Sequence, residues 1–275
     1  MQEEKISLSE KNKNKLILLA EMIDTGANEF TKEIKLTNLT LKNTLLYLNF
    51  AAVNNYSEGI YTLCADLRPF PAIVILRSVV EAFINTGYIL THNSDKRAVL
   101  FSMEDCYYKK GLVNEVLVFL GKYPNFEKDD FTRDNFTLVL EKIDKQIEIY
   151  KKKYKLGYTN RKDFEKDYQK KLLERARDAD RRIRRPDFEH IYLFAYRYFS
   201  EFGHLSARGL DHFVTKDHTG QHEVIVSQHD DIEHILAMTY TIYLYFLNEL
   251  KKRKMLSSNF PFSKFDKNWK EFSAV

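Results

Sequence analysis

Hydrophobic positions recur about every three or four residues along most of the chain, the spacing that places them on one face of an α-helix. Polar breaks separate these stretches, and a proline pair, Pro69 and Pro71, opens the most apolar of them. The expected helices cover residues 8–30, 39–65, 72–91, 95–121, 135–155, 188–205 and 230–254. The pattern therefore predicts an all-α protein built as a multi-helix bundle.

Two segments depart from this pattern. Residues 211–216 and 221–227 flank the turn sequence Asp-His-Thr-Gly, which predicts one small β-hairpin insertion. Residues 161–185 alternate acids and bases without a wide apolar face, so they form either an exposed helix held by charge pairs or a mobile arm. With no internal repeat and no linker, we expect a single helical domain over residues 1–275 that includes a basic arm at 151–185.

Composition agrees with a packed helical protein, because hydrophobic residues make up 44% and charged residues 30%, with only 9 Gly and 5 Pro. Cys64 and Cys106 have no CxxC or Cys/His spacing, and the first residues are acidic rather than basic as in an export signal. A cytoplasmic location is expected. The apolar stretch 70–90 includes charged residues, which predicts a buried helix and no membrane contact.

The net charge of +4 is unevenly placed, since residues 141–185 contain 17 Lys and Arg against nine Asp and Glu. Tyrosines at 150, 154, 158 and 168 are interleaved with these bases, a combination that can hold RNA through phosphate contacts and stacking. A solvated helix with interspersed acids explains the same composition. The candidate RNA-binding residues are Lys151, Lys152, Lys153, Arg181, Arg182, Arg184 and Arg185.

Two polar groups interrupt otherwise apolar helices. Arg77 and Glu81 lie four residues apart, so they share a helix face and are expected to form a buried ion pair or to shape a site. Further along, Arg197 and His204 return to nearly the same face of the aromatic helix after about two turns. Together with Ser200, they belong to a polar stripe that must be satisfied internally or open onto a cleft.

The stripe and the earlier helix resemble a known family. The stretch from Tyr196 to residue 206, YRYFSEFGHLS, together with the upstream LRSVVEAFINTGYI, is similar to a bacterial family of uncharacterised all-α domains related to the HEPN superfamily. That family shows an R-S-x-x-E helix and later a Y-x-x-x-S-x-x-x-H-x-S helix followed by a hairpin. The resemblance covers about residues 40–250, and the basic arm has no counterpart in it.

The resemblance implies a HEPN-like, metal-independent endoribonuclease, a toxin or phage-defence effector that acts on RNA as a homodimer. It implies that His204 is the general base or acid and that Arg197 stabilises charge on the phosphate. Tyr196, Ser200, Glu201, Arg77 and Glu81 are the expected supporting residues. No cofactor is expected.

Alternatives remain at this point. The HEPN signature, an arginine followed by a histidine after four to six intervening residues, is also matched by Arg184 and Arg185 with His190. His204 can instead be a packed core residue of a non-catalytic helical module that senses or binds a partner protein. Seven of the eight histidines lie between residues 190 and 234, but no HExxH or His-x3-His pair is present, so no metal site is expected.

Overall fold

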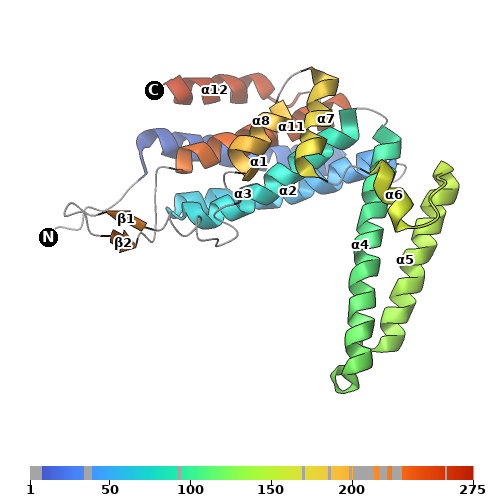
Figure 1. The fold of residues 1–275 in the computed structure, drawn as a ribbon. Coiled ribbons are helices and arrows are strands. Elements are labelled where there is room, and N and C mark those ends of the chain that lie inside the picture. Colours follow the sequence, from blue (N-terminus) through green and yellow to red (C-terminus); the bar gives the residue numbers. More distant parts are fainter. Residues whose placement is uncertain are drawn as a thin grey trace.

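The computed structural model describes residues 8–33, 39–91, 94–168, 171–184, 187–197, 200, 214–216, 222–224, 231–257 and 259–274. The prediction of an all-α multi-helix bundle is confirmed. Four long helices lie side by side in the main body (Figure 1), and they are α1 (Glu10–Glu33), α2 (Leu41–Ala65), α3 (Pro69–Thr91) and α11 (Ile232–Lys252). A further helix, α12 (Phe262–Ala274), packs against α1; the sequence pattern did not predict it.

The main core lies between these helices and is rich in aromatic rings. Phe50 of α2 contacts both Tyr243 and Phe246 of α11, with ring centroids 5.5 and 6.4 Å apart. The buried Tyr243 hydroxyl donates to the side-chain carbonyl of Asn54 at 2.6 Å, so its polar atom is satisfied inside the core. Because α3 is central to this core, it is apolar on most of its surface.

Among the described helices, α3 alone is long and apolar enough to cross a membrane, judged by length and composition only. In the folded chain 61% of its most apolar window is buried. A core helix of a globular protein shows the same combination.

A long helical pair projects from the body (Figure 1) and is called the stalk below. It consists of α4 (Ser94–Lys122) and α5 (Arg133–Tyr154), joined through the short 3-10 helix η1 (Pro124–Phe126). At the base of the stalk, Tyr107 and Ile147 form a small second core with Phe164 of α6 (Arg161–Asp167). Lys155 ends α5 with a left-handed φ of 52°.

The expectation of an exposed helix or mobile arm at 161–185 is wrong for its second half. Residues Leu172–Ile183 form α7, which packs on α3 in the main body. Ala176 and Ala179 of α7 are fully buried in the main core. Short side chains allow this close packing, although they give only a weak hydrophobic signal in the sequence.

Two short strands, β1 (Val214–Lys216) and β2 (His222–Val224), pair antiparallel, with Thr215 opposite Glu223. The turn that the sequence predicts between them, residues 217–220, lies outside the described residues.

Candidate functional site

The chain that leads into the candidate Arg–His pair forms a short α-helix and then a π-helical turn. α8 (Asp187–Ile191) continues directly into η2 (Tyr192–Arg197). The backbone amides of Phe188 and Glu189 donate to the two carboxylate oxygens of Asp180 on α7, at 2.8 and 2.7 Å. Burial raises the pKa of the Asp180 carboxyl. π-helical turns are rare in proteins as a whole but occur often at functional sites, so this turn marks the segment as a candidate functional site.

Tyr196 is fixed by a residue of the R-S-x-x-E helix. The Arg77 guanidinium donates to the Tyr196 hydroxyl at 3.2 Å, and its central carbon lies 4.9 Å from the centre of the Tyr196 ring. Tyr192 stacks against Tyr196 with centroids 5.4 Å apart, and the Ser200 hydroxyl donates to the Tyr196 carbonyl. The fold therefore joins the two sequence segments that carry the family resemblance.

The expectation of a buried ion pair between Arg77 and Glu81 is wrong as to burial. Glu81 is exposed, while Arg77 is half-buried and contacts Tyr196. Neither residue therefore belongs to a sealed core pair. Both lie where α3 faces the chain around Tyr196, which agrees with a role in shaping a site.

Arg197, the predicted catalytic arginine, has an exposed side chain at the end of η2. Its predicted partner His204 and the supporting Glu201 lie outside the described residues, so the distance between Arg197 and His204 stays a prediction. At least the arginine end of the polar stripe faces solvent rather than the core.

Beside Tyr196 the structure has a cavity with a volume of about 950 Å³, lined by both apolar and polar side chains and called the polar cavity below. It opens between α2, α3, the stalk, α7 and η2, and Glu81 and Tyr196 both line it. The other lining residues that carry polar chemistry or aromatic rings are Thr44, Asn85, Phe101, Ser102, Glu104, Asp105, Cys106, Tyr108, Lys109, Lys142, Gln146, Tyr150, Tyr168 and Arg175. Two of the predicted supporting residues thus belong to the same concave site.

A buried arginine organises one wall of the polar cavity. Arg175 of α7 is 8% exposed and donates to the Asn85 side-chain carbonyl at 2.6 Å and to the Tyr168 hydroxyl. Its guanidinium also lies 4.9 Å from the centre of the Tyr168 ring. These contacts fix the Asn85 amide and the Tyr168 ring in one orientation, which a binding site requires.

Burial determines the protonation state of Tyr168 on this wall of the cavity. Burial raises the pKa of the Tyr168 hydroxyl, while the nearby Arg175 lowers it and Glu104 raises it further, so the phenol stays protonated at neutral pH. The Oε2 atom of Glu104 is buried and has no hydrogen-bond partner among the described residues. An unsatisfied carboxylate oxygen is costly and calls for a donor.

Sequence reasoning missed Glu104, Asn85, Tyr168 and Arg175 as a group. They come from α4, α3, the end of α6 and α7, so no spacing along the chain connects them. Tyr168 was singled out only as one of the tyrosines interleaved with the basic residues. The other available signal was Asn85, a polar residue inside the most apolar helix. It indicates that a buried polar partner must exist, but not which residue provides it.

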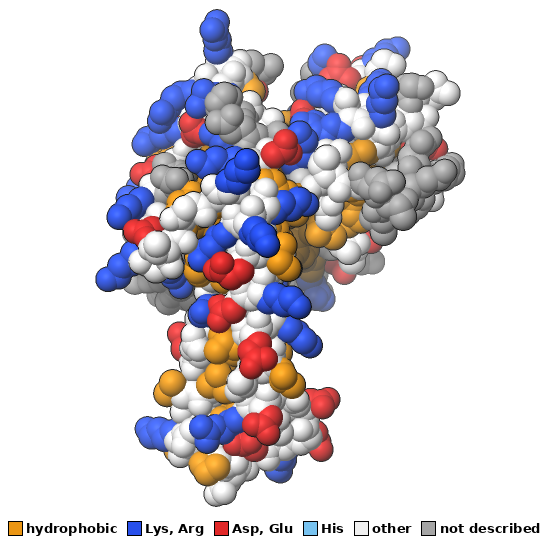
Figure 2. Space-filling view, turned by 90° about the vertical axis from the view of Figure 1, so that its right-hand side faces the viewer, with side chains coloured by type: hydrophobic (Ala, Val, Ile, Leu, Met, Phe, Trp, Pro, Cys, Tyr) orange, Lys and Arg blue, Asp and Glu red, His pale blue; other side chains and the backbone are white. Residues whose placement is uncertain are grey.

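The predicted RNA-binding residues do not form one continuous arm. Lys151, Lys152 and Lys153 end α5 on the stalk, whereas Arg181, Arg182 and Arg184 end α7 on the main body (Figure 1). All but Lys151 are exposed; Lys151 is half-buried, and its ammonium pairs with Glu148 at 2.8 Å. Arg185 lies outside the described residues. On the stalk face in Figure 2, acidic side chains are interspersed with the basic ones, as on a solvated helix.

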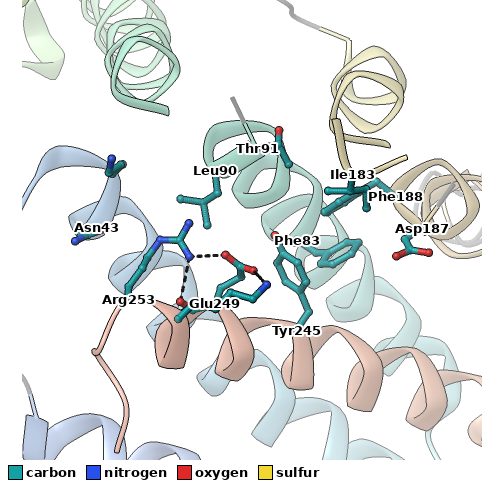
Figure 3. Close-up of a pocket in the computed structure, with 12 residues that line it drawn as sticks. Asn43, Phe83, Leu90, Thr91, Ile183, Asp187, Phe188, Tyr245, Glu249 and Arg253 are labelled. Atoms are coloured by element: carbon teal, nitrogen blue, oxygen red, sulfur yellow. Dashed lines mark hydrogen bonds and ion pairs between the residues drawn. The ribbon is translucent and has the colours of Figure 1, made fainter. Parts of the chain in front are cut away.

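A second cavity, of about 890 Å³, lies between α2, α3, α8 and α11 (Figure 3). Phe83 stacks on Phe188 and meets Tyr245 edge-on, with centroids 4.5 and 4.8 Å apart. The Glu249 carboxylate accepts from Lys252 at 2.6 Å and from Arg253. Because the Glu249 carboxylate is already paired with these two cations, this cavity is a weaker candidate than the polar cavity.

In the part of the chain that the structure describes, no group of three or more His, Cys, Asp or Glu residues is arranged to hold a metal ion.

Comparisons with known proteins give a family without an assigned activity. No curated protein and no solved structure matches the chain. Residues 43–222 match a family of unknown function (DUF5677), a span that includes α3, the stalk, α7, η2 and most of the polar cavity. The chain belongs to this family.

Proposed function

We propose that the protein is a HEPN-like, metal-independent endoribonuclease that acts in the cytoplasm as a homodimer, in the role of a toxin or phage-defence effector. The observation that carries the proposal is the exposed Arg197 at the end of a π-helical turn, directly after a tyrosine that lines a large polar cavity. An exposed arginine beside a cavity can bind a phosphodiester, because its guanidinium can donate two hydrogen bonds to the phosphate oxygens.

The chemistry needs a base, an acid and a cation near the scissile phosphate. His204 removes the proton from the RNA 2′-hydroxyl, or protonates the leaving 5′-oxygen, and water completes the other proton transfer. Arg197 stabilises the charge that develops on the phosphate. The 2′-oxygen then bonds to phosphorus as the bond to the 5′-oxygen breaks. The products are a 2′,3′-cyclic phosphate and a 5′-hydroxyl end. Arg77 acts as a positioning residue because it holds Tyr196, the neighbour of Arg197.

The test is cleavage of a labelled single-stranded RNA by the purified chain in excess EDTA. Wild type is expected to cut, and Arg197→Ala and His204→Ala are each expected to lose roughly a hundredfold or more in rate, as for loss of an acid–base or charge-stabilising group. Arg184→Ala and His190→Ala are matched controls, because both residues are exposed and together form the other arginine–histidine match to the HEPN signature. RNA that stays intact with wild type, or activity lost only in the control pair, would overturn the proposal.

A second candidate is a non-catalytic helical module that binds a partner protein, and the tip of the stalk favours it. Phe119, Tyr123 and Phe126 contact one another there and are 40%, 42% and 60% exposed. Exposed aromatic clusters mark interaction sites. In this case His204→Ala is expected to lower the melting temperature without changing any RNA-directed activity.

A further inference from the structure

The polar cavity is lined by a carboxylate of which one oxygen has no hydrogen-bond donor in the part of the chain that the structure describes. Glu104 lies on α4 at the base of the stalk, and its Oε2 atom is buried without a partner among the described residues. The terminal torsion of a glutamate is broad, so either carboxylate oxygen can turn toward a donor that enters the cavity. A ligand that binds here is therefore expected to offer N–H or O–H groups to Glu104.

The opposite hydrogen-bonding character is available on the same lining. The Asn85 carbonyl oxygen accepts from Arg175 at 2.6 Å, so this amide is held with its Nδ2 hydrogens left to donate. Asn85 is 7% exposed and Arg175 is 8% exposed, so the wall that orients the amide is itself buried. The cavity thus presents a carboxylate acceptor and an amide donor to one occupant.

The aromatic side chains on the cavity lining favour a flat aromatic ring as the ligand. Phe101, Tyr108 and Tyr196 line it, and Tyr108 is 66% exposed at its edge. Aromatic side chains bind nucleobases by stacking on their faces. Lys142 of α5 is exposed at the rim, where it can contact a phosphate.

We propose that the polar cavity is a guanine subsite. The guanine N1–H and N2–H groups donate side by side to the Glu104 carboxylate, and its O6 accepts from Asn85 Nδ2. Adenine presents a ring acceptor where guanine has N1–H, and uracil and cytosine lack the adjacent donor pair, so each satisfies the carboxylate less well. The inference rests on the proposed function in one respect: Tyr196 lines the cavity next to Arg197, so the bound guanine is one that adjoins the scissile phosphate.

The subsite is tested first without any cleavage. Isothermal titration of the full chain with 5′-GMP, 5′-AMP, 5′-CMP and 5′-UMP is expected to show the tightest binding for 5′-GMP, by roughly tenfold or more, the scale of one bidentate base contact. Glu104→Gln is expected to remove this preference, while Glu115→Gln, an exposed acid further along the same helix and outside the cavity lining, leaves it intact. Equal binding of all four nucleotides, or unchanged 5′-GMP preference in Glu104→Gln, would overturn the subsite.

Cleavage mapping separates the subsite from the proposed nuclease. Selective 5′-GMP binding by a chain that leaves RNA intact supports the subsite and rejects the nuclease. Cleavage at all four bases, with the same pattern in Glu104→Gln, keeps the nuclease and rejects the subsite. A chain with both properties is expected to cut next to guanine and to lose that selectivity in Glu104→Gln.

Discussion

Gly87 lies in the buried part of α3, where the ring of Phe188 from α8 packs directly over the backbone. A Cβ atom at this position would lie 2.1 and 2.2 Å from two carbons of the Phe188 ring. Phe188 is 2% exposed and stacks on Phe83 with centroids 4.5 Å apart, so the ring cannot move away without disturbing the core. Gly87→Ala is therefore expected to destabilise the protein, although alanine is the better helix former.

The magnitude follows from two opposing effects. Overpacking a well-filled core costs about 1–3 kcal/mol, and this contact is short enough for the upper part of that range. Replacing a helical glycine by alanine returns about 1 kcal/mol. The net loss is about 1–2 kcal/mol, or roughly 2–8 °C in melting temperature for a chain of this size.

Gly59 of α2 provides the matched control. A Cβ atom there meets only a methyl carbon of Ile75 at 3.5 Å, an ordinary contact, so Gly59→Ala is expected to stabilise the protein by up to about 1 kcal/mol. Thermal and urea unfolding followed by circular dichroism compare both variants with wild type. The double variant Gly87→Ala with Phe188→Leu should lose less free energy of unfolding than the sum of the losses in the two single variants. A Gly87→Ala protein as stable as Gly59→Ala would refute the packing argument.

Three further predictions concern paired or buried side chains. The hydrogen bond from Lys15 lowers the pKa of Glu233. The stability that this contact provides is therefore present above the ordinary value of 4.5 and is lost as the pH falls through the folded pKa. Glu233→Gln is expected to unfold more easily than wild type at pH 7, and this difference is expected to shrink in urea titrations as the pH is lowered below 4.5. Burial raises the pKa of the Cys64 thiol to about 12 and also raises the pKa of the half-buried Cys106 thiol. In the native protein at pH 8, a thiol reagent is therefore expected to modify at most Cys106, and slowly, whereas both cysteines react once denaturant is added. Rapid reaction of two thiols in the native protein would contradict this. The buried Tyr240 hydroxyl has no partner among the described residues, so Tyr240→Phe should leave the free energy of unfolding unchanged or raise it by about 1 kcal/mol, and a loss above that size would show that the hydroxyl is satisfied.

Most helix boundaries could be predicted from the sequence because hydrophobic periodicity and local end signals act within one segment. The expected helix at 39–65 is observed at Leu41–Ala65, and that at 230–254 at Ile232–Lys252. The two prolines at 69 and 71 fall in the first turn of α3, where a missing amide hydrogen costs little. These outcomes depend on neighbours in sequence, which the pattern contains.

The position of α7 could not be predicted in the same way. Its buried face includes Arg175 and Asp180 beside two alanines, so the residues that enter the interior are charged or small. Arg175 is satisfied by Asn85, and Asp180 by the backbone amides at the start of α8. Each contact joins segments that are distant in sequence or lie across a turn, and no local rule reveals them. Charge alternation therefore predicted an exposed helix or a mobile arm where the fold has a packed helix.

The candidate site shows the same limit. Tyr196 was chosen from a motif, and Asn85 stands out in the sequence only as a polar residue in an apolar helix, yet both line one cavity with Glu104 and Tyr168. What connects them is the packing of α7 and η2 on α3, which places Arg175 between Asn85 and Tyr168, and Arg77 against Tyr196. A single change on α7, such as Arg175→Met, should therefore disturb nucleotide binding more than an exposed change such as Arg181→Met on the same helix, because only the first releases the Asn85 amide.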